Sequence, residues 1–335
     1  MPDSAGSPPA RGASPAAGPQ LRRRRASSSA AAAAAGAVLD TAKQVESSVE
    51  RALLWAWDEL PHWRRDNAFI LSGYRPTSNS FRASAGSLLY LHNESVNIWS
   101  HLLGSFAAAL CAVAACLLVR WELAPRWAGA SSGDVVAFAC FFGGAVACLG
   151  MSATYHALCN HSPEVARWGN KLDYTGIVFL IVGSYVPALY YGLFCLPGLM
   201  TVYLSMICIL GTGCLTVSWF DHFRTPAWRP YRALMFVGLG VSGVVPVLHG
   251  MEIYGYAALN ERMGLNWVLL QGATYIFGAF LYAARWPERT RPGKFDIWGS
   301  SHQLFHLLIL LAAGFHLQGM TKAFDYHHSV MGAKC

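Results

Sequence analysis

Three histidines have the residue type and the spacing of a metal site. His302 and His306 lie four residues apart, so a helix places both imidazoles on one face, within reach of a single ion. An isolated pair of this kind is more typical of interhelical hydrogen bonding or interfacial anchoring. His156 changes that interpretation, because a third imidazole at the same depth completes the three-protein-ligand set typical of catalytic zinc. We therefore predict a zinc site formed by His156, His302 and His306.

Two oxygen-bearing side chains accompany the histidines. Ser152 lies one helical turn before His156, and Asp173 follows His156 by 17 residues. Each has a plainer interpretation, since Ser152 suits ordinary helix packing and Asp173 suits a helix N-cap. Beside a zinc ion, however, a carboxylate can orient a water molecule or take its proton, and a hydroxyl can hydrogen-bond to it. We predict catalytic roles for Asp173 and Ser152.

The elements that position these residues are predicted to be transmembrane helices. Only 13% of the 335 residues are charged and 54% are hydrophobic, whereas an ordinary globular protein carries about 25% charged residues. A helix that spans a membrane needs about 20 predominantly apolar residues. Six charge-free stretches of at least 19 residues meet this requirement, at 95–119, 135–163, 174–220, 233–251, 263–284 and 297–321. They are near-continuous apolar runs, without the alternating pattern of a β-barrel strand.

The longest stretch is predicted to hold two helices. Cys195-Leu196-Pro197-Gly198 is a turn signal that divides it into helices near 173–195 and 198–219. The fold class is therefore an all-α membrane protein with a seven-helix bundle. In this arrangement His156 ends the second helix, Asp173 begins the third, and His302 and His306 lie in the first turns of the seventh, so all four lie at one end of the bundle.

The loop charges predict the orientation. With a cytosolic N-terminus, the cytosolic loops carry nine Lys and Arg residues and the opposite loops carry five. Because cytosolic loops are enriched in basic residues, this favours an N-terminus in the cytosol and a C-terminus outside or in a lumen. The predicted site then lies at the cytosolic end. The net charge of +7 is explained by this flanking role, so no nucleic-acid partner is expected.

Four segments are predicted along the chain. Residues 1–40 form an Ala-, Ser- and Pro-rich tail with a basic run at 22–25, and this composition predicts disorder. Residues 41–97 form a juxtamembrane helical region, where apolar residues at helical spacing predict an amphipathic helix over 41–60. Residues 98–320 form the transmembrane domain, and 321–335 a short C-terminal tail. The nine cysteines are scattered without a close metal-type pair, so we interpret them as packing residues and expect no disulfide framework.

The sequence resembles the progestin and adipoQ receptor family, which includes adiponectin receptors, fungal zinc-homeostasis membrane proteins and haemolysin III-like proteins. Before the first span, Gly73-Tyr74-Arg75-Pro76 and the run His92-Asn93-Glu94-Ser95-Val96-Asn97-Ile98-Trp99-Ser100-His101 match the adiponectin-receptor pattern. Ser152-x3-His156, Lys171-Leu172-Asp173-Tyr174-Thr175-Gly176 and Ser301-His302-Gln303-x2-His306 then match the three signature positions of the family in order. The resemblance covers about residues 58–320, and we expect a fungal member.

The resemblance implies a seven-helix bundle with a cytosolic N-terminus and a zinc ion held by His156, His302 and His306. Because family members resemble alkaline ceramidases in their zinc constellation, it also implies hydrolysis of a lipid amide, with ceramide as the leading substrate, in lipid and zinc homeostasis signalling. Asp173 would position or deprotonate the water, and Ser152 would assist. The expected location is the plasma membrane or the endoplasmic reticulum, with membrane lipids as partners and an extracellular protein ligand as a further one.

Other functional classes fit the sequence less well. It has no Asp-Arg-Tyr or Asn-Pro-x-x-Tyr signature of a G-protein-coupled receptor, and 297–321 contains no lysine for a retinal Schiff base. No internal repeat of a transporter is visible. The alternative that stays open is a ligand-responsive, non-enzymatic receptor whose zinc is structural.

Overall fold

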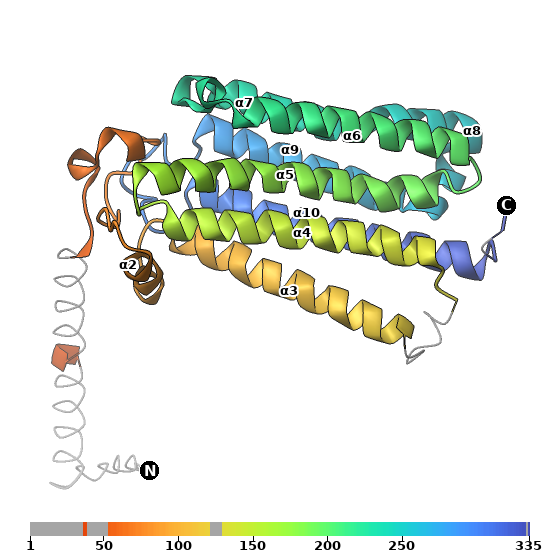
Figure 1. Ribbon diagram of the computed structural model, residues 1–335, viewed down its shortest axis with the longest axis horizontal. Coiled ribbons are helices and arrows are strands. Elements are labelled where there is room, and N and C mark those ends of the chain that lie inside the picture. Colours follow the sequence, from red (N-terminus) through yellow and green to blue (C-terminus); the bar gives the residue numbers. More distant parts are fainter. Residues whose placement is uncertain (1–35, 39–52, 121–128, 333) are drawn as a thin grey trace, which may run out of the picture. The chain divides into compact units, whose positions relative to one another are not determined.

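Seven helices long and apolar enough to cross a membrane make up most of the computed structural model (Figure 1), as the charge-free stretches predict. The structure describes residues 36–38, 53–120, 129–332 and 334–335, of which 54–335 form one compact unit. The first four spans are α3 (Ser95–Arg120), α4 (Ser132–Leu158), α5 (Pro163–Gly192) and α6 (Pro197–Trp219). The fifth consists of α7 (Arg229–Val241) and α8 (Val244–Met263), followed by α9 (Leu265–Ala284) and α10 (Ser301–Ser329). Within the described residues no strand occurs, and the chain is an integral multi-pass membrane protein.

Several helix boundaries differ from the predicted ones, and those of α5 and α10 matter most for the site and the end of the chain. α5 begins at Pro163 behind the N-cap Ser162, whose side chain accepts a hydrogen bond from Val165. Asp173 therefore lies inside the helix, so the predicted start at 173 and the N-cap interpretation of Asp173 are wrong. α10 continues to Ser329, into the segment that we assigned to a C-terminal tail. Both helices extend through charged residues, so a gap between charges marks the apolar part of a helix and not its end.

The fifth span is broken in a way that the charge pattern does not indicate. α7 ends at Val241 and α8 begins at Val244, with Ser242 and Gly243 between them. The Tyr185 hydroxyl of α5 lies 2.9 Å from the Gly240 carbonyl oxygen and 3.1 Å from that of Leu239. A helix break inside a membrane needs such a partner, because the freed carbonyl groups have no water to bond.

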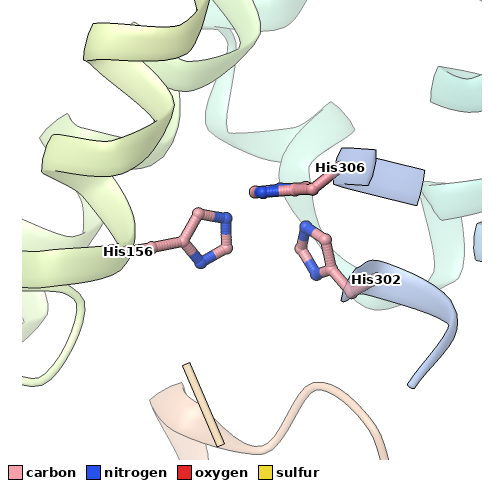
Figure 2. A group of neighbouring side chains, drawn as sticks. All are labelled: His156, His302 and His306. Carbon is pink, nitrogen blue, oxygen red and sulfur yellow. The ribbon is translucent and has the colours of Figure 1, made fainter. Parts of the chain in front are cut away.

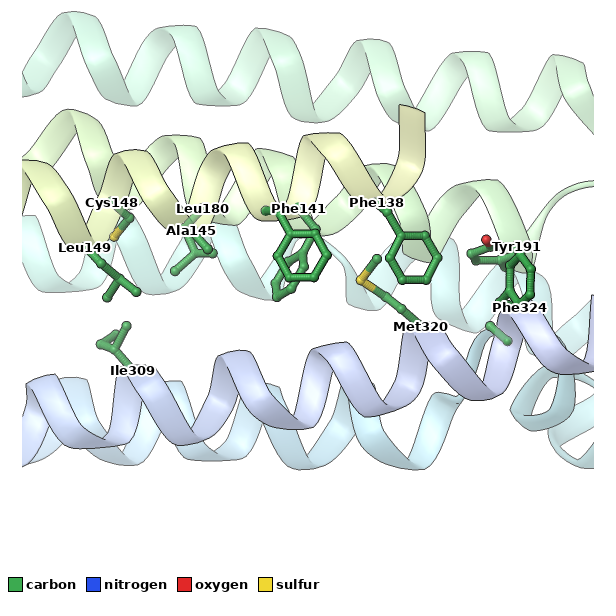
Figure 3. Close-up of a cluster of buried hydrophobic side chains, with 12 residues drawn as sticks. Phe138, Phe141, Ala145, Cys148, Leu149, Leu180, Tyr191, Ile309, Met320 and Phe324 are labelled. Carbon is green, nitrogen blue, oxygen red and sulfur yellow. The ribbon is translucent and has the colours of Figure 1, made fainter. Parts of the chain in front are cut away.

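The core lies between α4, α5 and α10. Figure 1 shows these helices between α3 on one side and α6, α7 and α8 on the other. Figure 3 shows the side chains that fill the space between the three central helices, including Phe138 and Phe141 of α4, Leu180 of α5, and Met320 and Phe324 of α10. α4 and α10 carry the three predicted zinc ligands, so the main core of the bundle also sets the spacing of the site.

Two glycines let α4 and α5 approach closely. A Cβ at Gly183 would lie 2.4 Å from the Cys140 carbonyl oxygen, and a Cβ at Gly176 would lie 2.7 Å from the Cys148 Cα. Small residues at a helix interface allow backbones to meet, which is a main source of helix association in membranes. The contact connects the helix that carries His156 and Ser152 with the helix that carries Asp173.

The segment before α3 packs over the end of the bundle at which the histidines lie. It contains the 3-10 turns η1 (Trp57–Glu59), η2 (His62–Arg64) and η3 (Ser87–Leu89) and the short helix α2 (Phe81–Gly86). Fully buried Arg75 donates to the carbonyl oxygens of His156 at 2.6 Å and Ala157 at 2.9 Å, which satisfies the last turn of α4. The amphipathic helix predicted over 41–60 and the tail over 1–40 lie largely outside the described residues, and Trp57–Glu59 is a 3-10 turn.

The opposite end of the bundle holds a buried polar cluster and a disulfide. Asp134 of α4 accepts hydrogen bonds from Tyr191 of α5 at 2.7 Å and from the Ser131 hydroxyl at 2.6 Å, and His328 of α10 lies 3.0 Å away. Cys195, in the α5–α6 turn, is bonded to Cys335 with a Cα–Cα distance of 5.4 Å. The interpretation of all nine cysteines as packing residues is therefore wrong for this pair, because the α5–α6 turn and the last residue of the sequence meet at this end.

Candidate metal centre

The three predicted zinc ligands converge at one end of the bundle. Figure 2 shows His156 approaching from α4 and His302 and His306 from α10, with their rings turned toward one another. One ring nitrogen of each lies within 4.8 Å of the others. His156 and His306 are each only 2% exposed. The predicted convergence of a third imidazole on the His302–His306 pair is therefore present in the fold.

Glu94 orients the His156 ring. Its Oε2 atom lies 2.8 Å from His156 Nδ1, and Asn97 Nδ2 donates to the same carboxylate at 2.7 Å. With Nδ1 occupied, His156 Nε2 is buried without a hydrogen-bond partner. A carboxylate on the far nitrogen of a metal-binding histidine fixes the tautomer and makes the ligand nitrogen more basic.

The charge of Glu94 suits this role. Burial disfavours its ionised form, but the charge of the adjacent His156 and the hydrogen bond between them outweigh burial and hold the pKa of Glu94 well below its usual value. Glu94 is therefore a carboxylate that accepts a hydrogen bond from His156 Nδ1–H. A metal bound at Nε2 would take the place of the proton there, so His156 would hold it as a neutral imidazole whose Nδ1–H remains hydrogen-bonded to Glu94.

His306 has two partners from α3, which begins directly after Glu94. Its Nδ1 atom lies 3.2 Å from the Asn97 carbonyl oxygen, which suits an N–H donor at that position. The His101 ring stacks on the His306 ring at a centroid distance of 3.6 Å and an interplanar angle of 5°. Glu94 and the first turns of α3 thus orient two of the three histidines, one through a carboxylate and one through a carbonyl group and a ring.

The residues present fit a zinc ion. Zinc takes imidazole nitrogens at about 2.0–2.1 Å, and catalytic sites provide three protein ligands and leave one position open. The three nitrogens lie within 4.8 Å of one another, and rotation about the side-chain bonds can bring each of them to this distance from a single ion. An orphaned, buried Nε2 on His156 is the atom that a metal would satisfy. Among the described residues, this is the one group of three or more His, Cys, Asp or Glu side chains close enough to share an ion.

The two predicted catalytic residues lie beside the histidines. Asp173 and Ser152 line the same cavity as His302 and His306, and the Ser152 hydroxyl lies within hydrogen-bonding reach of the Asp173 carboxylate. Ser152 is 3% exposed, one turn before His156 on α4. The fold therefore brings all five predicted residues together.

The cavity next to these residues is large and mainly apolar. It has a volume of about 650 Å³ and is lined by α4, α5, α7, α8, α9 and α10, together with His101 of α3 and Asp66. Along α5 its walls include both Asp173 and Gly192, which at 1.5 Å per residue are about 28 Å apart. It thus runs from the histidines across most of the thickness of a hydrocarbon core. A space of this length and polarity suits a lipid chain.

Three residues of the site were not predicted individually. Glu94, Asn97 and His101 belong to the run 92–101 that carries the family resemblance, but they were given no roles. A signal was available, because a glutamate and a histidine at the start of a predicted span are costly in a membrane unless they have partners. Their identity as partners of His156 and His306 depends on how α3 packs against α4 and α10.

Comparison with known proteins agrees with the family resemblance. The family described as Haemolysin-III related matches residues 89–317. The ADIPOR-like receptor IZH2 of Saccharomyces cerevisiae is 45% identical over 287 residues, which cover 83% of this chain and 86% of that protein. The Adiponectin receptor protein of Drosophila melanogaster is 42% identical over 301 residues, covering 88% of this chain and 66% of that protein. The ADIPOR-like receptor IZH1 of Eremothecium gossypii is 38% identical over 273 residues, covering 82% and 85%.

Proposed function

Because the chain belongs to the Haemolysin-III related family and is an adiponectin-receptor-like membrane protein, we propose that it is a zinc-dependent hydrolase of lipid amides, with ceramide as the leading substrate. The reaction would contribute to lipid and zinc homeostasis signalling. The observation that carries the proposal is the meeting of three histidines, buried His156 and His306 and half-buried His302, with Asp173 at one end of a long apolar cavity.

The chemistry divides between the metal and the chain. Zinc held by His156, His302 and His306 would supply Lewis acidity and make water a stronger nucleophile at neutral pH. Asp173 would take a proton as water adds to the amide carbonyl carbon, and it would return a proton to nitrogen as the C–N bond breaks. The products are a fatty acid and a sphingoid base. Ser152, within reach of Asp173, would hold the carboxylate toward the water.

The cavity supports a lipid substrate over a soluble one. Among its wall residues, Leu180, Leu189, Val247 and Phe305 offer only hydrocarbon to a bound molecule. Burial of a methylene group stabilises a complex by about 0.8 kcal/mol, so a long acyl chain gains much more from this space than a small amide does. The carbonyl carbon of a lipid bound in this way would lie at the histidine end.

A receptor function is the second candidate, and it is favoured by the names of the relatives. The yeast and fly proteins are called receptors. In this alternative the zinc would hold α4 and α10 together without taking part in a reaction, and an extracellular protein ligand would shift the bundle between two states.

Release of fatty acid from ceramide by purified protein separates the two candidates. The enzyme proposal predicts turnover that stops when a chelator removes the metal and returns when zinc is added back. The receptor candidate predicts a different result. The purified protein would contain zinc and have the same melting temperature as a preparation that binds its ligand, but it would release no fatty acid from any lipid amide. Replacement of the amide by an ether-linked lipid, which cannot be hydrolysed in this way, is the substrate control.

A further inference from the structure

A second, small cavity adjoins the candidate metal centre. It has a volume of about 80 Å³, enough for several water molecules or a small polar group. Three separate segments form its walls: the region before α3, the first turn of α3 with the residues before it, and the α9–α10 connection. The residues that line it are mostly polar, namely Arg64, Asp66, Asn67, Ile70, Tyr74, Asn93, Glu94, Asn97, Arg285, Asp296, Ser300 and His302.

The walls of this polar pocket are held by their own contacts. Arg285 is paired with Asp66 at 2.5 Å across two of the segments. Asp296 accepts hydrogen bonds from the Leu71 backbone at 3.0 Å and the Ser72 hydroxyl at 2.7 Å. These contacts tie the α9–α10 connection to the segment before α3, so the pocket is a formed space between anchored segments.

Three lining residues nevertheless carry a buried polar atom without a partner. These atoms are Asn93 Oδ1, Asn97 Oδ1 and Arg285 Nε. A buried donor or acceptor that lacks a partner costs about 1–3 kcal/mol, so three such atoms in the walls of one small pocket favour the binding of a polar group there. Two of the three are acceptors, and the walls carry three carboxylates against two guanidinium groups. The pocket is therefore suited to a group that donates hydrogen bonds, such as an ammonium or a hydroxyl.

The polar pocket and the apolar cavity share two lining residues. Asp66 and His302 belong to both walls, so the two spaces meet at the candidate metal centre. A long apolar space joined at one point to a small polar one is complementary to an amphiphile. The scissile bond of such a molecule would lie at the junction, next to His302.

We propose that the polar pocket binds the hydrogen-bond-donating head of the lipid, an amino or hydroxyl group, while the chain occupies the apolar cavity. Asn93 and Asn97 accept from this head, and the Arg285–Asp66 pair forms another part of the wall. The proposal deepens the proposed hydrolase function and rests on it for the identity of the bound molecule as substrate or product.

Binding of two matched amphiphiles to the purified holoprotein tests the head-group selectivity. One probe is a long-chain 2-amino-1,3-diol, and the other is the same chain ending in a methyl ether, which accepts hydrogen bonds but cannot donate them. We expect the amino-diol to bind at least about tenfold more tightly below its critical micelle concentration, the effect of one or two recovered hydrogen bonds. Equal affinity within about twofold would overturn the proposal, and this arm needs no variant.

Substitution of Asn93 tests whether the polar pocket is the source of the head-group selectivity. Asn93→Leu keeps the volume of the side chain and removes Oδ1, so we expect it to lose most of the tenfold preference while the affinity for the methyl ether stays unchanged. Asn266→Leu is the matched control, because Asn266 is exposed at the start of α9 and outside both cavities. If Asn93→Leu does not fold, Asn93→Ala is measured in its place. A folded Asn93 variant that retains the full preference contradicts the assignment.

Failure of this proposal and failure of the hydrolase proposal give different results. Head-group-selective binding without fatty-acid release from ceramide supports the pocket and overturns the hydrolase function. Fatty-acid release by a protein that binds both amphiphiles equally supports the hydrolase function and overturns the pocket.

Discussion

Two buried polar clusters lie at opposite ends of the same bundle, and they differ in how completely their hydrogen bonds are made. At one end, both Asp134 oxygens are occupied, Oδ1 by Tyr191 and Oδ2 by Ser131 and His328. At the other end, His156 Nε2 and both ring nitrogens of His101 are buried without partners. Both clusters contain histidines and a carboxylate, so residue type alone does not distinguish them.

The difference teaches which cluster is structural and which is a site. A buried polar group normally finds a partner within the protein or in bound water, and each exception requires an explanation. The Asp134 cluster needs no further ligand, since it caps α4 and connects it with α5 and α10. The histidine cluster retains unused ligand atoms at the edge of a cavity, which is the state expected of a protein whose partner is a metal and a substrate.

The largest effect is expected from Asp173→Asn. The amide cannot take a proton at neutral pH, so ceramide hydrolysis should fall about 10²–10⁴-fold while zinc content and melting temperature stay close to those of the unmodified protein. Ser162→Ala is the control on the same helix, because it removes the true N-cap of α5 and should cost about 0.5–2 kcal/mol of stability without loss of turnover per folded molecule. Near-normal turnover by Asp173→Asn would remove Asp173 from the mechanism.

A smaller effect is expected from Glu94→Gln. Because Glu94 orients His156 as a carboxylate, the neutral amide should weaken zinc binding by about 10–100-fold. Competition with a chromogenic chelator measures this directly and needs no substrate. Asp134→Asn alters the other buried carboxylate and should leave zinc affinity unchanged. An equal loss of zinc in both variants would mean that global destabilisation, and not orientation of His156, is responsible.

A still smaller effect is expected from Tyr191→Phe, which removes one hydrogen bond from the satisfied cluster. Interhelical hydrogen bonds in membrane proteins contribute about 0.6 kcal/mol on average, with a maximum of about 1.7 kcal/mol. The expected result is a slightly lower melting temperature with zinc content and hydrolysis unchanged. A marked loss of zinc in this variant would show that the two ends are coupled, and it would contradict a purely structural role for the Asp134 cluster.

No modification at all is expected at two glycosylation acceptor patterns at the histidine end. Asn93-Glu94-Ser95 and Asn160-His161-Ser162 should face the cytosol and carry no glycan. The Cys195–Cys335 disulfide should lie on the other side, where oxidising conditions preserve it, and a tag after Cys335 should be accessible from outside intact cells or from the lumen. A glycan on Asn93 or Asn160 would reverse the orientation.

The sequence predicted the number of spans and the three histidines of the candidate site because both depend on local features. Charges are costly in hydrocarbon, so gaps between them mark membrane segments directly. His302 and His306 share a helix face by spacing alone, and His156 follows once the helix count is known. The depth of all three histidines in the membrane can therefore be predicted without knowing how the helices pack.

The features that were missed depend on packing or on distant parts of the chain. Glu94 became a partner of His156 only when α3 was placed against α4. The bond between Cys195 and Cys335 joins residues separated by 140 positions, a pairing that spacing cannot indicate. The early start of α5 was hidden because Glu164 and Lys171 lie in a helical part that extends beyond the apolar segment.

The glycine contact between α4 and α5 has a consequence for genetics. A methyl group added at Gly176 would meet the Cys148 backbone at 2.7 Å, so the two helices would have to separate close to Asp173, three residues away. Because a misplacement of about 1 Å can lower a reaction rate about 10²-fold, Gly176→Ala would produce a folded, zinc-loaded and nearly inactive protein. In a screen for loss of function, this position, buried between two helices, would be classified with the catalytic residues although it would touch neither metal nor substrate.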